Sequence, residues 1–352
     1  MLKSLFIVGV LLVLPLLSQG YAGQVNSFIY HRFDETRYPS TNIDAKIFAQ
    51  QLEYVTAQGL EVITLGEVAR RLSDGEELPD RAVSFCVDDA FRSFYDVGMP
   101  IIRQYGIPVT LFVNTAAVGS SGYLNWQELK ELAAEGVEIG NHTDTHPYLV
   151  EKKSTETYAQ WKQRIRQDIL KSQQKFEKNL GTRPTLFAYP FGEYSDAVVE
   201  IVKELGFKTA FAQQSGVIYS AHNHYNLPRF PMGGPFATLA SFKTKLAMQP
   251  LSVSGEDSFD PVIGENPPVL HLHIAGQKID PQRLNCFVQG KNRCWVEADV
   301  NKGPGWYQVL AVEPLTGRRN KYTLTFQSRE GDWFWYSHPW INAKNPAKKV
   351  TD

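Results

Sequence analysis

Between about residues 27 and 248, short apolar runs alternate with amphipathic segments, and this alternation constrains the fold more than any other feature. The apolar runs have the length and composition of buried strands, while the longer segments carry apolar residues at helical spacing. We expect strands at 27–30, 82–87, 107–113, 137–140, 185–190 and 207–212, and helices at 43–59, 125–136, 155–180 and 195–206, with a further helical stretch that ends near residue 106. Repeated strand–helix alternation predicts a parallel α/β sheet, open or closed into a barrel. The chemistry of such folds lies on loops that follow the carboxyl ends of the strands.

The pattern changes after residues 249–268, a stretch with four prolines and scattered small polar residues. We interpret this stretch as a linker. Beyond it, residues 269–352 form short runs of period two, which predict a small all-β module, most simply a sandwich. The sequence therefore predicts two domains, 23–248 and 269–352.

The first 22 residues have the order of a secretory signal. Lys3 precedes a mostly apolar run of thirteen residues from Leu5 to Leu17, and the small residue Ala22 follows. The run is shorter than the roughly 20 residues that span a bilayer, which disfavours the alternative of an uncleaved anchor. We expect cleavage near Ala22 and a periplasmic, secreted or cell-surface protein with no remaining membrane span.

Charge and cysteine content exclude two further classes. The chain has 36 basic and 37 acidic residues, whereas nucleic-acid binding normally requires a basic surface. Three cysteines are too few for a disulfide-built scaffold. Cys286 and Cys294 flank a turn and can form a cross-strand disulfide, while Cys86 lies in an apolar run and reads as a buried thiol rather than a nucleophile.

Four polar residues follow two of the predicted strands. Asp88 and Asp89 end the strand at 82–87, and His142 and His146 follow the strand at 137–140. Either pair alone is compatible with ordinary turn or loop chemistry. Together, one carboxylate and two imidazoles make a three-ligand divalent metal site, and the second carboxylate can act as a base. The turn at 187–192 lies at the same rim and can present a backbone N–H to an oxyanion.

These motifs, in this order, resemble those of the polysaccharide deacetylases of carbohydrate esterase family four, whose catalytic unit is called the NodB-type domain. The resemblance covers about residues 25–235. FCVDDAF is similar to the family's Thr-Phe-Asp-Asp-Gly motif with Ala90 in place of glycine, and HTDTH fits His-Ser/Thr-x-x-His without deviation. FAYPFGEYS resembles the third motif, with Ala188 where the larger family has an arginine. The resemblance implies a distorted (β/α) barrel and metal-assisted hydrolysis of an N-acetyl amide.

Two departures point to one branch of the family. The usual late Leu-x-His motif is not evident before residue 249, whereas FIYHRF opens the domain. This is similar to the circularly permuted deacetylases that modify poly-N-acetylglucosamine in biofilm matrices, which implies that His31 is the general acid. His271 and His273 are the alternative, disfavoured because they lie beyond the proline-rich stretch. Arg229 is the candidate to replace the missing arginine by pairing with Asp88, and Arg183 is the less favoured one.

The resemblance also implies the remaining roles. Asp89, His142 and His146 would hold a divalent metal, with zinc favoured by two nitrogen ligands and one oxygen ligand. Asp88 would be the base, and the Phe191 backbone N–H would share the oxyanion charge. The partner would be an N-acetylated polysaccharide, and we expect a monomer.

Aromatic residues are candidates for holding sugar. We expect Trp126, Tyr189 and Tyr194 to line the cleft. Trp333 and Trp335 alternate onto one face of a predicted strand, where they are either core residues, the favoured reading, or a stacking platform.

Two other functions stay open at this stage. The first is a non-catalytic matrix-binding protein that keeps the deacetylase fold to bind glycan, which Ala90 and Ala188 keep in consideration. The second is a deacetylase that acts on peptidoglycan or on O-acetyl groups.

Overall fold

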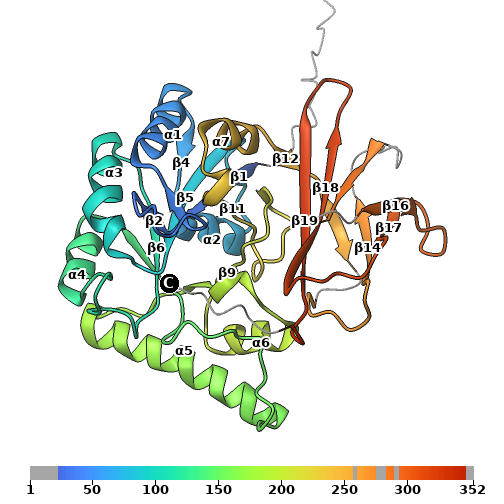
Figure 1. Ribbon diagram of the computed structural model, residues 1–352. Coiled ribbons are helices and arrows are strands. Elements are labelled where there is room, and N and C mark those ends of the chain that lie inside the picture. The colour runs from blue at the N-terminus through green and yellow to red at the C-terminus, as the bar shows by residue number, and fades with distance from the viewer. Residues whose placement is uncertain (1–22, 257–259, 275–282, 289–292, 346–352) are drawn as a thin grey trace, which may run out of the picture.

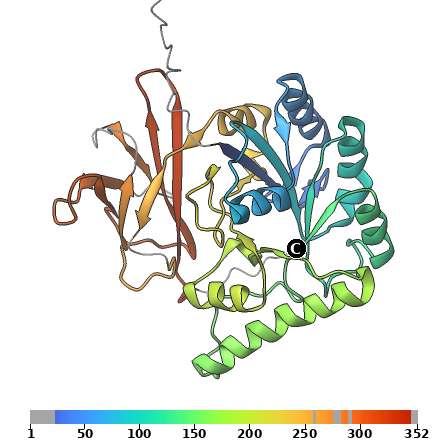
Figure 2. The same ribbon diagram turned by 180° about the vertical axis from the view of Figure 1, so that it is seen from behind.

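The computed structural model describes residues 23–256, 260–274, 283–288 and 293–345, so the predicted signal segment 1–22 lies outside the described residues. Figure 1 shows two parts side by side, a curled sheet with helices on its outer side and a strand-rich part beside it. The same arrangement is seen from behind in Figure 2. Within the described ranges, no helix has the length and apolarity needed to cross a membrane.

A nine-stranded sheet forms the core of the first part. Its main path runs β10-β1-β5-β6-β7-β8-β9, and β11 and β4 pair with β1 and β5. All pairings in this sheet are parallel except that of β10 with β1. The strands are β1 (Gln24–Tyr30), β4 (Glu61–Val62), β5 (Ala82–Asp88), β6 (Thr110–Val113), β7 (Glu138–Asn141), β8 (Leu186–Ala188), β9 (Thr209–Phe211), β10 (Ile218–Tyr219) and β11 (Phe230–Pro231). The predicted parallel α/β sheet is confirmed as a curled, incomplete barrel, and each predicted strand coincides with an observed one.

Helices connect the strands where helical spacing predicts them. They are α1 (Ala45–Ala57), α3 (Met99–Tyr105), α4 (Trp126–Ala134), α5 (Tyr158–Leu180) and α6 (Asp196–Glu204), and α3 follows a short π-helix, Phe94–Gly98. Two further helices, α2 (Leu65–Asp74) and α7 (Leu239–Leu246), are additional to the prediction. The sequence does contain the end signals of helix α2. Thr64 caps its first turn, and Gly75 ends it in the left-handed conformation.

The strand-rich part, here called the β-module, consists of two four-stranded sheets. One has the order β12-β19-β18-β15 and the other β13-β14-β17-β16. The strands are β12 (Gln249–Pro250), β13 (Val253–Glu256), β14 (Val269–Ile274), β15 (Asn285–Phe287), β16 (Cys294–Ala298), β17 (Trp306–Ala311), β18 (Arg319–Gln327) and β19 (Trp333–Ile341). Apolar residues of both sheets share one buried cluster, which includes Leu272, Val309 and Leu324. The predicted second, all-β unit is therefore present.

The stretch 249–268 differs from the expected linker. Residues 249–250 pair with β19 and residues 253–256 pair with β14, so both segments belong to the sheets of the β-module. The reason is that the alternating apolar residues Leu251 and Val253 are buried in the β-module core. The prolines around them made this stretch resemble a linker in the sequence.

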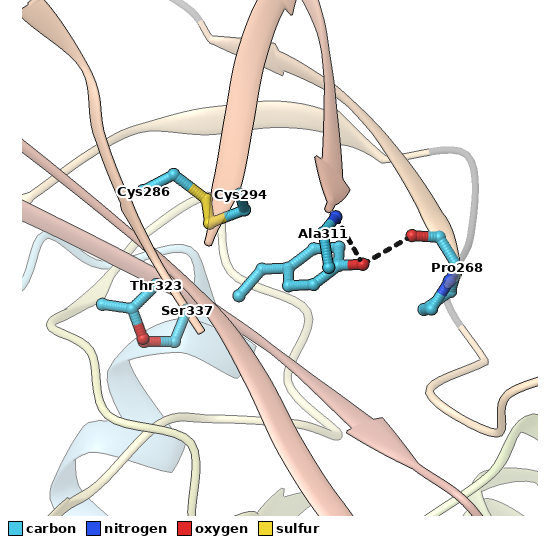
Figure 3. Close-up of a disulfide and its surroundings, with 7 residues drawn as sticks. Pro268, Cys286, Cys294, Ala311, Thr323 and Ser337 are labelled. Carbon is cyan, nitrogen blue, oxygen red and sulfur yellow. Dashed lines mark hydrogen bonds between the residues drawn. A yellow bond between two sulfur atoms is a disulfide. The ribbon is translucent and has the colours of Figure 1, made fainter. Parts of the chain in front are cut away.

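A disulfide joins the two sheets of the β-module at their edges (Figure 3). Cys286 lies in β15 and Cys294 in β16, which belong to different sheets. The predicted pairing is thus present, but it crosses between sheets rather than between strands of one hairpin. Nearby, the Tyr322 hydroxyl accepts a hydrogen bond from the Ala311 N–H and donates one to the Pro268 carbonyl, which also ties the sheets together. Cys86 is a buried free thiol, as expected.

Sheet β12-β19-β18-β15 faces the barrel, whereas β14, β16 and β17 lie on the far side of it (Figures 1 and 2). Trp335 of β19 packs edge-on against Phe230, with ring centroids 5.8 Å apart, and its indole N–H donates to the Ser215 carbonyl. Trp335 is therefore an interface residue rather than part of a sugar platform. Trp333, in contrast, is 38% exposed. The two tryptophans therefore form neither a shared core nor a shared stacking platform.

Candidate active site

Four polar side chains meet at the carboxyl ends of β5 and β7. Nε2 of His146 lies 3.4 Å from Oδ1 of Asp89 and 3.2 Å from Nε2 of His142. Nε2 of His142 lies 3.6 Å from the same Asp89 oxygen and 3.8 Å from Oδ2 of Asp88. The structure thus brings the four residues together because parallel strands present their carboxyl ends at one edge.

Asp89, His142 and His146 form a possible metal site. Their ligand atoms all lie within 4.8 Å of one another. A tetrahedral ion with bonds of about 2.0–2.2 Å separates its ligand atoms by roughly 3.3–3.6 Å, close to the distances found here. The residues present therefore fit a divalent ion with at least one open position.

The environment of both imidazoles keeps them available as ligands. Nδ1 of His142 lies 2.8 Å from the Ala188 carbonyl oxygen, so Nδ1 carries the hydrogen and Nε2 is left with a lone pair. Burial lowers the pKa of His142 and of His146 to about 4. Both rings are therefore neutral near pH 7, as ligation requires.

Asp88 pairs with Arg229, and neither side chain is exposed. Nη1 and Nη2 of Arg229 donate to Oδ1 and Oδ2 of Asp88 at 2.8 and 2.9 Å. Burial by itself would raise the pKa of Asp88, but the charge and hydrogen bonds of Arg229, together with His142, outweigh it and hold that pKa below its usual value. Arg183, the alternative partner, instead bonds to Glu177 in an exposed pair.

Among the described residues, no arginine or lysine is bonded to Asp89. Burial raises the pKa of Asp89 above its ordinary value, and His142 and His31 oppose that shift. Its nearest amide contact is Nδ2 of Asn114, 3.4 Å away. The pKa values of the two adjacent aspartates are thus shifted in opposite directions. Asp88 is paired with the Arg229 guanidinium, whereas Asp89 is free to bind a metal ion.

Strained backbone gathers at this site. The described residues include six non-glycine residues with positive φ, and five of them lie in the loops around the site: Asp89, Ala90, Thr143, His146 and Phe191. Such conformations cost about 1–3 kcal/mol each and persist only where the surroundings hold them. At Ala90 φ is 56°, which is why glycine suits this position in the family's motif.

Helix α5 holds the loop that carries the two histidines. Asp168 accepts hydrogen bonds from the backbone N–H groups of Asp144 and Thr145. The buried Asp144 carboxylate contacts the amino groups of Lys171 and Lys175, at 2.7 and 2.5 Å. These contacts fix the backbone between the ligands, and sequence reasoning did not identify them because their partners lie more than 20 residues away.

Phe191 lies beside the metal cluster in the turn that follows β8. Its φ is 59°, and its ring centroid lies 4.4 Å from that of His146 and 3.9 Å from that of Tyr148, nearly parallel to the latter. Nη1 of Arg319, from β18 of the β-module, donates to the Phe191 carbonyl oxygen at 3.2 Å. The sequence predicts the turn but not the arginine that contacts it.

His31 follows β1, next to β5 in the sheet. Its Nε2 lies 3.4 Å from Nε2 of Gln213, and it is close enough to Asp88, Asp89 and His146 to influence their pKa values. His271 and His273 are on β14 in the far sheet of the β-module, where they contact Asp299 and Ser254. The structure thus brings His31, and not the alternative pair, to the cluster.

Two of the three predicted sugar-binding aromatic residues need correction. Tyr189 and Tyr194 are 0% and 1% exposed, and their hydroxyls bond to the Tyr225 carbonyl and to Asn226. They pack in the core between β8 and α6, because the turn directs them inward, and have no face for a sugar. Trp126 is half-buried edge-on against Phe176, and its contact with substrate stays a prediction.

Comparison with known proteins agrees with this geometry. The sequence profile of the family described as polysaccharide deacetylase matches residues 75–210. The poly-beta-1,6-N-acetyl-D-glucosamine N-deacetylase of Staphylococcus aureus (strain MRSA252) is 26% identical over 214 residues, which cover 59% of this chain and 73% of the relative. The protein of the same name from Escherichia coli (strain K12) is 25% identical over 203 residues, 48% of this chain and 30% of the relative.

Solved structures show the same fold. IcaB from Ammonifex degensii superposes with a TM-score of 0.57 at 23% identity, covering 64% of this chain and 98% of that one. The Streptococcus pyogenes deacetylase PplD, solved with acetate, gives a TM-score of 0.56 at 24% identity, covering 63% and 98%. The expected NodB-type fold is confirmed, and the β-module lies beside it. The chain therefore contains a polysaccharide deacetylase domain, which the family profile matches over residues 75–210.

Proposed function

We propose that this enzyme hydrolyses the N-acetyl amide of N-acetylglucosamine residues in a polysaccharide, with a poly-N-acetylglucosamine-like exopolysaccharide as substrate. The observation that carries the proposal is the arrangement of the two aspartates. The Asp88 carboxylate is kept ionised by Arg229 and lies 3.8 Å from a ligand atom of the Asp89–His142–His146 cluster. The names of the S. aureus and E. coli relatives support this substrate class.

A divalent ion held by Asp89, His142 and His146, zinc by the chemistry of the donor set, would supply polarisation of the acetyl carbonyl and a lower pKa for a water molecule. Asp88 is then the base that accepts the proton of the attacking water. Both of its oxygens accept hydrogen bonds from Arg229, which fixes the orientation of the carboxylate.

Two further groups of the chain complete the reaction. The Phe191 backbone N–H, in the strained turn after β8, stabilises the negative charge on the carbonyl oxygen, as backbone donors do in acyl transfer. His31, which follows β1 near the cluster, donates a proton to the amine that leaves. A separate base and acid suit amide hydrolysis, in which nitrogen must be protonated before it departs.

Acetate release from a glycan panel tests the proposal. We expect poly-N-acetylglucosamine oligomers to release acetate, and a chelator to abolish that release until a divalent ion is restored. The panel should include peptidoglycan fragments and O-acetylated xylan. Release from one of these substrates alone would favour the alternative specificities, and binding without release from any substrate would favour a glycan-binding protein on a deacetylase fold.

Replacing His31 tests the assignment of the acid. We expect His31→Ala to lower kcat by about 10²–10⁴-fold with metal content unchanged, because a positioned proton donor contributes about that much. The matched control is His271→Ala, which removes a histidine of the far β-module sheet. Acetate release and bound metal are measured in both variants. Equal rates in the two would show that the acid is another group.

A further inference from the structure

Two adjacent arginines of the β-module, Arg318 just before β18 and Arg319 at its first position, contact the active-site turn. Arg318 and Arg319 contact Glu193 and Phe191, which are separated from them by more than 120 residues of sequence. Both partners belong to the turn after β8, whose Phe191 backbone is assigned to the oxyanion. The β-module thus meets the catalytic domain at a part of the reaction site as well as at Trp335.

Arg318 forms a buried ion pair with this turn. Its Nε and Nη2 donate to Oε1 and Oε2 of Glu193, both at 2.8 Å, and the side chains are 8% and 1% exposed. Its guanidinium also lies 4.5 Å from the centroid of the Tyr148 ring, and Nη1 donates to the Asn345 carbonyl. A bidentate pair, with these two further contacts of Arg318, fixes Glu193 in one place.

Arg319 holds the strained residue itself. Its Nη1 donates to the Phe191 carbonyl at 3.2 Å, and its guanidinium lies 5.6 Å from the centroid of the Phe191 ring. The Phe191 ring also stacks on the Tyr148 ring, which in turn contacts the Arg318 guanidinium. A left-handed phenylalanine needs outside support, and these contacts supply it.

Attachment of the β-module does not depend on these arginines. The Trp335 indole of the β-module donates to the Ser215 carbonyl of the catalytic domain. In addition, the Tyr219 hydroxyl of the catalytic domain bonds to the backbone of Val253 in β13. Arg318 and Arg319 therefore hold a catalytic turn rather than the module.

We infer that the β-module completes the active site, with Arg318 and Arg319 as positioning residues that hold the Phe191–Glu193 turn in its reactive conformation. The inference rests on the proposed deacetylation. Preorganisation is what gives an oxyanion donor its effect, since a donor that must reorganise during the reaction stabilises less charge. The Phe191–Glu193 turn is preorganised in that sense, because Arg318 and Arg319 of the β-module hold it in one conformation.

Arg319→Ala is the principal variant, because Arg319 is exposed and its loss leaves no buried charge unpaired. We expect kcat to fall about 10–100-fold, less than the 10²–10³-fold effect of losing an oxyanion donor, with KM within about twofold and bound metal unchanged. Arg319→Lys, which keeps one donor, should recover part of kcat. The matched control is Arg283→Ala, because Arg283 also donates to a carbonyl, that of Gln327, and lies 5.3 Å from the Phe326 ring.

Hydrogen exchange of the peptide that spans residues 186–195 gives a readout independent of activity. We expect faster exchange in Arg319→Ala and in the double variant Arg318→Ala/Glu193→Gln, and wild-type exchange in Arg283→Ala. A loss of kcat with unchanged exchange, or faster exchange with unchanged kcat, would overturn the inference. If the wild type releases no acetate from any glycan, the proposed function fails, and unchanged exchange in both turn variants would then reject the positioning role as well.

Discussion

Asp88→Asn is expected to lower the rate of acetate release by about 10²–10⁴-fold while the bound metal stays at its wild-type level. Asparagine keeps the shape of the side chain but cannot accept a proton at neutral pH. Asp88 is not one of the three possible metal ligands, so the metal site itself is intact in this variant. Rate and metal content are measured on the same preparation.

The buried position of Asp88 calls for a stability control. Arg229 is fully buried, and Asp88→Asn removes the negative charge that balances it. Breaking a buried ion pair by removing one partner costs about 3–5 kcal/mol, so the thermal unfolding midpoint should fall. The assay therefore belongs well below that midpoint. Asp299→Asn, which removes a carboxylate bonded to His271 in the β-module, is the matched control. A folded Asp88→Asn protein that retains the rate of this control would remove Asp88 from the role of base.

The sequence was sufficient for the parts of the site that depend on strand ends. A parallel strand places the residue after its last apolar position at a known edge, so Asp88 and His142 were expected close together and are found there. The pairing of Arg229 with Asp88 was also expected and is present as a bidentate contact. Only the proximity was open to prediction, since the bond geometry depends on packing.

The rest depended on contacts that have no local signal. Tyr189 and Tyr194 flank a tight turn, and a turn sequence does not say which way its side chains point; both point into the core. Arg318 and Arg319 lie in a different domain from the turn that they contact. Period-two runs predict strands of a sandwich but not which face meets another domain. The linker prediction failed for a related reason. β12 is only two residues long, and it forms a strand because it pairs with β19, which is distant in the sequence.

His142→Ala is the variant expected to remove the metal. His142 is 1% exposed and is oriented by the Ala188 carbonyl, and alanine at this position supplies no ligand atom in its place. Loss of a partner that merely orients a metal ligand already costs about 10–100-fold in metal affinity, and loss of the ligand itself should exceed that. We expect the variant to emerge from dialysis without stoichiometric metal and to release acetate at the rate of the chelated wild type.

The matched control for this variant is His273→Ala, which removes a histidine of the β-module that contacts Ser254 and Trp306. Metal content by elemental analysis and acetate release are compared in both proteins. Equal metal content in the two variants would place the ion away from Asp89, His142 and His146. Metal loss in His142→Ala with full activity would separate the ion from the chemistry. Loss of metal and activity in His142→Ala, with both retained in His273→Ala, would show that the reaction depends on the cluster at the ends of β5 and β7. Each variant replaces one histidine by alanine, the first in the catalytic domain and the second in the β-module.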